Sequence, residues 1–112
     1  MAQFEKLVVW QRAYDLSVSV DQAVRRMPAH AALQLRRSAA SIPDNIAEGS
    51  ARGTTRQFIY FLDIASGSCA EAQSQLRRAH ACGQLERAAF LELIDAAQQI
   101  GWMLGALRRR WA

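Results

Sequence analysis

The sequence predicts an all-α protein, a single domain over residues 1–112 that folds as an antiparallel up-down-up-down four-helix bundle. Apolar residues recur at spacings of three and four in four successive stretches, which is the period of helices that each bury one face. Short connections separate these stretches, and short loops make neighbouring helices antiparallel. The chain has only 2 prolines and 6 glycines, and no stretch alternates as a half-buried strand would.

The first predicted helix runs from about Trp10 to Met27. Pro28 ends it, because the residue before a proline is disfavoured in the α-helical region of backbone space. We expect one stripe of apolar residues to face the core: Ala13, Leu16, Val20, Val24 and Met27.

The second predicted helix runs from about Ala31 to Glu48 and carries two neighbouring apolar stripes. The stripes consist of Leu35, Ala39, Ile42 and Ile46, and of Leu33, Ala40 and Ala47. Pro43 removes one backbone hydrogen bond and crowds the preceding turn, which predicts a kink near Ala39. Gly49 follows the last periodic residue, and we interpret it as the glycine just beyond the end of this helix.

The third predicted helix begins at a capping box, in which Thr54 is the N-cap and Gln57 lies three residues later. A heptad then continues through Phe58, Leu62, Ala65, Cys69, Ala72, Leu76 and Ala79, and Gly83 closes the helix. The fourth runs from Glu86 to about Arg109. Its stripe is Phe90, Leu93, Ala97, Ile100, Leu104, Leu107 and Trp111. A period of 3.5 in both helices predicts shallow crossing angles.

Composition excludes several classes of protein. Hydrophobic residues make up 51% of the chain, which is too apolar for a disordered protein. No apolar run approaches the ~20 residues of a membrane-spanning helix, and the N-terminus lacks the pattern of a signal peptide. Cys69 and Cys82 are expected on one helix about 20 Å apart, too far for a disulfide. Reduced cysteines suit a cytoplasmic protein.

The chain is basic, with 14 Lys and Arg against 10 Asp and Glu and a net charge of +4. All of the basic residues except Lys6 are arginines. Arginine is the side chain best suited to bidentate contacts with phosphate, although a bias toward arginine also follows from genomic base composition. In an antiparallel bundle these charges gather at the two ends, whereas Asp63, Glu71 and Asp95 lie at the middle.

Three arginine clusters are therefore candidate nucleic-acid contacts. They comprise Arg25, Arg26, Arg77, Arg78, Arg108, Arg109 and Arg110. An alternative explanation is that cations in the last turns of helices interact favourably with the helix dipole. The sequence leaves both interpretations open.

Polar residues recur at helical spacing on the second and third helices, beside their apolar stripes. We expect a structural polar network of Arg36, Arg37, Asn45, Glu48 and Glu71, formed within the chain or between subunits. The third helix also carries Tyr60, Phe61 and Ile64 outside its heptad. A helix with apolar residues on more than one face favours an additional partner, such as a second subunit.

No arrangement of residues indicates catalysis, a metal or a cofactor. His30 and His80 are the only histidines, and neither lies in a pattern typical of a nucleophilic site. His80 and Cys82 are two residues apart on a helix and so point in different directions. The segment 49–53 lacks the lysine and the preceding strand of a phosphate-binding loop. We therefore expect that the protein is not an enzyme.

Three segments resemble one known family. These are FEKLVVWQ at residues 4–11, RRSAASIPDNIAEG at residues 36–49 and FIYFLDIASGS at residues 58–68. They are similar to the four-helix-bundle proteins of bacterial 23S rRNA intervening sequences, also called S23-type. The accessory variability determinants of diversity-generating retroelements are related to that family. The resemblance implies a homopentameric ring and no established enzymatic activity, and its retroelement relatives bind nucleic acid and reverse transcriptase through a basic surface.

Two main functions follow as hypotheses. The first is a non-enzymatic oligomer whose basic ends contact RNA or DNA. The second is a protein-binding adaptor or scaffold whose arginines recognise an acidic partner. A third hypothesis, a bundle that holds a small ligand or a metal, has no specific residues to support it.

Overall fold

The computed structural model describes residues 3–112, and this part of the chain is entirely helical, without a strand. Two short 3-10 turns accompany four α-helices. The elements are the turn Phe4–Lys6, α1 (Val8–Ala23), the turn Val24–Arg26, α2 (Ala29–Ala51), α3 (Thr55–Ala81) and α4 (Arg87–Trp111). No helix within residues 3–112 combines the length and the hydropathy needed to cross a bilayer.

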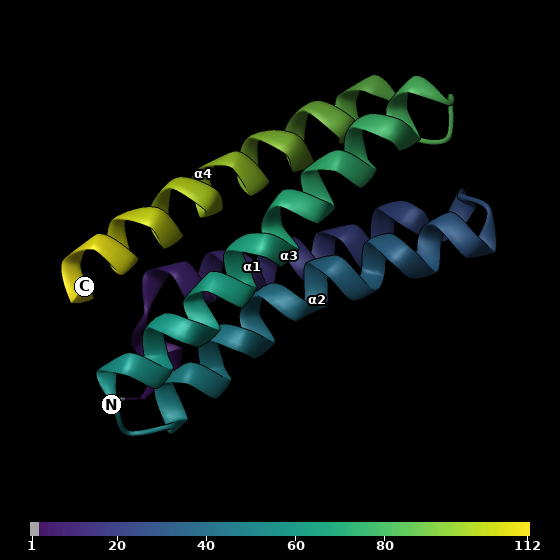
Figure 1. Ribbon diagram of the computed structural model, residues 1–112. Coiled ribbons are helices and arrows are strands. Elements are labelled where there is room, and N and C mark those ends of the chain that lie inside the picture. Colours follow the sequence, from purple (N-terminus) through teal and green to yellow (C-terminus); the bar gives the residue numbers. More distant parts are fainter. Residues whose placement is uncertain (1–2) are drawn as a thin grey trace.

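Each helix packs against the next one along the chain, and α1 also packs against α4. In the diagonal pairs, α1 with α3 and α2 with α4, no Cα atoms of the described residues lie within 8 Å of each other. The bundle measures 43 × 21 × 20 Å. Both chain ends and the α2–α3 connection lie at one end, and the other two connections lie at the opposite end (Figure 1). The antiparallel order of the four helices therefore agrees with the prediction.

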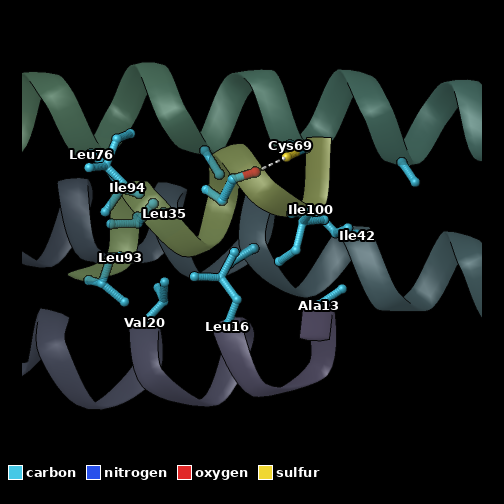
Figure 2. Close-up of a cluster of buried hydrophobic side chains, with 14 of the residues drawn as sticks. Ala13, Leu16, Val20, Leu35, Ile42, Cys69, Leu76, Leu93, Ile94 and Ile100 are labelled. Carbon is cyan, nitrogen blue, oxygen red and sulfur yellow. Dashed lines mark hydrogen bonds between the residues drawn. The ribbon is translucent and has the colours of Figure 1, made fainter. Parts of the chain in front are cut away.

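The core consists of the predicted stripes. The first predicted stripe is buried, although α1 ends at Ala23, so that Val24 lies in the following 3-10 turn and Met27 just after it. The four residues of the first α2 stripe and the seven of the α3 heptad are also buried, and Figure 2 shows part of this core. The prediction was less accurate for α4. Ile94 joins the core, whereas Phe90 and Leu107 are only partly buried and Trp111 is exposed. The second α2 stripe lies outside the core, since Leu33 is exposed.

Cys69 links α3 to α4 in the middle of this core. Its thiol donates a hydrogen bond to the Ala97 carbonyl oxygen at 3.2 Å, drawn as the dashed line in Figure 2. Burial raises the pKa of the Cys69 thiol, and a hydrogen bond from Gln73 opposes that shift. Cys69 therefore serves as a buried, neutral packing residue, while the other free cysteine, Cys82, is exposed.

The interpretation of Gly49 was wrong. Gly49 lies inside α2 and is buried, and the helix continues to Ala51. The glycine beyond the helix end is Gly53, with a φ of 82°. Pro43, by contrast, lies inside α2 as predicted, and the helix continues past it.

Gly49 is required for a different reason, which is the close approach of α3. A Cβ atom at this position would lie 2.8 Å from the Cβ of Phe61 and 3.3 Å from the backbone oxygen of Phe58. Arg52 lies over the Phe61 ring, with its guanidinium carbon 5.1 Å from the ring centroid. The missing side chain thus allows two phenylalanines of α3 to pack directly on the α2 backbone.

Both ends of α3 form as the sequence predicts. The Gln57 backbone N–H donates to the Thr54 hydroxyl oxygen at 3.2 Å, and that hydroxyl donates to the Gln57 side chain. At the other end, Gly83 has a φ of 72° and its N–H donates to the His80 carbonyl. A further bond from the Gln84 N–H to the Ala79 carbonyl completes a Schellman motif.

A polar seam lies beside the apolar contact between α2 and α3. The Ser41 and Ser68 hydroxyls are 2.7 Å apart, and the Asn45 amide donates to the Ser41 hydroxyl at 2.9 Å and to its carbonyl at 2.7 Å. One turn away, Ser38 donates to a Glu71 carboxylate oxygen at 3.0 Å. These five residues, the α2–α3 seam, fix how α2 and α3 align along their length.

We expect Gly49→Ala to lower the free energy of unfolding by about 1–3 kcal/mol, because the added methyl group overpacks the Phe61 contact. Urea titration would measure it. The matched control is Gly67→Ala on α3, where a Cβ meets nothing within 4 Å. That variant should be neutral or stabilised by ~0.5–1 kcal/mol. Equal effects of the two substitutions would contradict this role for Gly49.

We expect Ser68→Ala to lower the free energy of unfolding by about 0.5–1.5 kcal/mol, because it removes the hydrogen bond to Ser41 across the seam. Ser74→Ala, at an exposed position of α3, should change it by less than ~0.5 kcal/mol. Thermal and urea unfolding of the two variants would measure the difference. A Ser68 variant as stable as the Ser74 variant would show that the seam does not stabilise the fold.

Candidate nucleic-acid interface

The topology brings the predicted arginine clusters to opposite ends of the bundle. Arg25 and Arg26 lie in the 3-10 turn after α1, and Arg77 and Arg78 lie near the end of α3. These four form the loop end, beside the α1–α2 and α3–α4 connections (Figure 1). The terminal end carries the second group, Arg108, Arg109 and Arg110, in the last turn of α4. All seven side chains are exposed.

Arg108 differs from the other six because it has a partner. Its Nε donates to Asp63 Oδ1 at 2.6 Å and its Nη2 to Oδ2 at 3.3 Å, so the two groups form a bidentate pair between α4 and α3. The hydrogen bond to Asp63 raises the pKa of Arg108, and the Coulomb attraction adds to the shift. Arg108 therefore ties α3 to α4, and its guanidinium is already occupied.

The other six arginines have no hydrogen bond or ion pair from their side chains to any residue in 3–112. Cations near helix C-termini interact favourably with the helix dipole. However, each end then holds several like charges that form no ion pair in the described structure, and like charges in proximity repel. The guanidinium groups of these six arginines therefore keep their N–H donors available for an anion from outside the protein.

Exposed aromatic rings accompany the arginines toward the terminal end. Tyr60 is 62% exposed, and it lines a hollow of about 450 Å³ with Thr54, Arg56 and Gln57. Trp111 lies edge-on against Phe58 with ring centroids 5.6 Å apart, which holds it next to the arginines of the last α4 turn. Aromatic rings beside cations are the groups on which single-stranded nucleic acids stack their bases.

The sequence did not single out these rings as site residues. Trp102 on α4 is a further exposed ring that was not singled out. Its side chain is 74% exposed although it lies in a helix with a buried apolar stripe. A sequence signal was available: position 102 falls between the heptad positions 100 and 104. A tryptophan outside the heptad stripe is expected on the outer face of the helix.

The loop end is concave. A hollow of about 490 Å³ lies between the start of α2 and the end of α3. Its polar lining residues are His30, Gln34, Gln75, Arg78 and Gln84. The Gln75 Oε1 atom is buried without a hydrogen-bond partner in the described structure. Arg78 thus borders a polar recess rather than a flat surface.

The predicted network of Arg36, Arg37, Asn45, Glu48 and Glu71 does not form as one unit within the chain. Arg36 bonds Asp21 on α1 at 2.9 Å, and Glu48 pairs with Arg52 at 3.5 Å. Asn45 and Glu71 belong to the α2–α3 seam, and Arg37 is exposed. The reason is helical geometry: positions 36 and 45 are two and a half turns apart at about 3.6 residues per turn, so they project from opposite flanks of α2.

The two histidines have different surroundings. His80 stacks on Phe90 with ring centroids 4.4 Å apart, and its Nδ1 is 3.1 Å from the Leu85 carbonyl oxygen. His30 is exposed at the loop end. Among residues 3–112, no three His, Cys, Asp or Glu side chains are placed to hold a metal ion.

Comparison with known proteins identifies the fold and the family. A crystal structure of a protein with unknown function from the S23 ribosomal protein family of Bacteroides thetaiotaomicron VPI-5482 superposes with a TM-score of 0.84. The match covers 90% of this chain and 98% of that one at 20% identity, so it establishes the fold. No functionally curated protein matches the sequence. The family described as 23S rRNA-intervening sequence protein matches residues 5–106, and the chain therefore belongs to this family.

Proposed function

We propose that this protein is a non-enzymatic homo-oligomer of the cytoplasm that binds RNA or DNA through the arginines at the ends of its bundle. One observation carries the proposal: six arginines stand exposed at the two ends without an ion-pair partner in the described structure. Guanidinium groups form bidentate contacts with phosphate, and clustered cations release counterions when they bind a polyanion.

Two further features support a nucleic acid as the polyanion. Tyr60 and Trp111 place aromatic faces near the terminal-end arginines, which suits unpaired bases. Arg78 at the loop end borders a recess lined by glutamine side chains, which can donate to and accept from base edges.

The oligomer is supported by apolar residues that the single chain leaves exposed on α1 and α2. Tyr14, Val18 and Leu33 are between 42% and 49% exposed. Val18 and Ala40 also line a shared hollow between the two helices. A second copy would bury this surface. The S23-type resemblance implies that the copies close into a homopentameric ring.

The second candidate function is an adaptor that recognises an acidic protein with the same arginines. The unpaired guanidinium groups suit carboxylates as well as phosphates. The aromatic rings beside the arginines favour nucleic acid, because they provide the stacking that bases require.

We expect the protein to bind a fluorescein-labelled RNA hairpin or a duplex DNA in fluorescence-anisotropy titrations. Affinity should fall by ~10³-fold or more between about 50 and 200 mM salt if six or more phosphates are contacted. Arg77→Gln/Arg78→Gln and Arg109→Gln/Arg110→Gln should each reduce the slope of log K against log salt by about 1–2, since each removes up to two contacts.

The control for charge is Arg12→Gln/Arg36→Gln, which removes the same net charge from arginines that already bond Gln99 and Asp21. Its salt slope should match the unmodified protein. Absence of binding at 50 mM salt would overturn the nucleic-acid function. Retention of an acidic protein partner under those conditions would favour the adaptor.

We expect sedimentation equilibrium at micromolar concentration to give a multiple of the 12.5 kDa chain mass, with five copies in the implied ring. Val18→Glu/Leu33→Glu should yield a smaller species because it places charges on the exposed apolar surface of α1 and α2. Leu91→Glu on α4 is the control at a similarly exposed leucine and should leave the mass unchanged. A single 12.5 kDa species from the unmodified chain would contradict the oligomer.

A further inference from the structure

A groove of about 570 Å³ lies between α1 and α4. It extends from Arg12 to Ala23 on α1 and from Ala89 to Ile100 on α4. At a rise of about 1.5 Å per residue, each wall is about 17 Å long, or roughly three helical turns. The groove is separate from the arginine clusters at the two ends.

Small side chains keep this groove open. Ser19 and Ala23 line it from α1, and Ala89 and Ala96 line it from α4. Below them lie three buried residues of the core: Leu16, Leu93 and Ile100. An apolar floor between two helices is the form that accepts a third helix with apolar residues at positions i, i+3 or i+4, and i+7.

The rim of the groove is acidic, although the protein as a whole is basic. Asp15 lies on α1, and Glu92 and Asp95 lie on α4. All three side chains are exposed, and none forms an ion pair in the described structure. Carboxylates on both walls therefore line the same hollow without forming an ion pair in the described structure.

Arg12 is the one basic residue that lines the groove, and it does not neutralise these acids. Its Nη1 donates to Gln99 Oε1 at 3.2 Å, and Gln99 in turn donates to Asp95 Oδ2 at 2.9 Å. These two hydrogen bonds connect α1 to α4 across one end of the groove. The carboxylates of Asp15 and Glu92 retain all their acceptor capacity toward an external donor.

We propose that the α1–α4 groove is the docking site for a basic amphipathic helix of another protein. The apolar floor would receive one face of that helix, and lysines or arginines flanking this face would pair with the acidic rim. Nucleic acid does not fit here, because its phosphates would meet three carboxylates. A second copy is assigned instead to the exposed apolar surface of α1 and α2.

The test uses labelled helical peptides of ~18 residues, with leucines at spacings of three and four and with lysine, glutamine or glutamate on the flanks. The lysine peptide should bind one per chain in anisotropy titrations, at least tenfold more tightly than the glutamine peptide, and the glutamate peptide should not bind. Chemical-shift changes should be confined to residues 12–23 and 89–100.

Two triple variants provide the matched comparison. Asp15→Asn/Glu92→Gln/Asp95→Asn should weaken the lysine peptide at least tenfold. Glu5→Gln/Asp44→Asn/Glu86→Gln removes the same charge from exposed carboxylates outside the groove and should weaken it less than threefold. Equal weakening by both variants would show general charge attraction and overturn the proposal. Shifts outside the groove, or failure of every peptide to bind, would also overturn it.

Discussion

The close contact between α2 and α3 is the constraint on which the rest of the structure depends. At one end, Gly49 lets Phe58 and Phe61 pack on the α2 backbone. Farther along, Ser41 meets Ser68 in the α2–α3 seam. Packing at one point and hydrogen bonding at another allow only one alignment of the two helices, because a shift by one turn would break both. That alignment turns the α3 heptad toward the core.

Once α2 and α3 are aligned, the positions of the other two helices follow. The α3 heptad offers an apolar stripe against which α4 packs, and the Cys69 thiol bonds the Ala97 carbonyl across that interface. The Arg108–Asp63 pair holds the far end of α4. The α1–α4 contact is the last one that this alignment determines. Alanines and a serine line its outer part. The groove therefore lies where the bundle is least filled.

The side chains proposed for binding are those that contribute no ion pair to the described fold. Within residues 3–112, neither the loop-end arginines nor Arg109 and Arg110 form an ion pair, and the same holds for the carboxylates of Asp15, Glu92 and Asp95, which line the groove. Among the described residues, the arginines without an ion pair gather at the ends, and the three groove carboxylates lie along one side. Such segregation leaves repulsion within each group, which a binding partner of opposite charge would relieve. Nucleic acid and a basic helix would thus occupy different surfaces.

The sequence predicted most of the fold because periodicity depends on local geometry. All seven positions of the α3 heptad were predicted correctly, and the two ends of α3 were identified from Thr54 and Gly83. Gly49 was misread because a glycine required for close packing looks the same in sequence as one required for a turn. The partner of Arg36 within the chain, Asp21, was not predicted, because it depends on which flank of α2 meets α1. The groove could not be predicted, since it depends on how closely α1 approaches α4.

The central claim is that the arginines without ion-pair partners serve binding and that their mutual repulsion destabilises the folded state. Its most direct test is the free energy of urea unfolding of the unmodified protein at about 20 and 500 mM NaCl, where the screening length falls from roughly 20 Å to below 5 Å. The account predicts that stability rises with salt, because screening relieves repulsion at the ends. A fall in stability with salt would show that the arginines mainly stabilise helix termini, which would contradict the account.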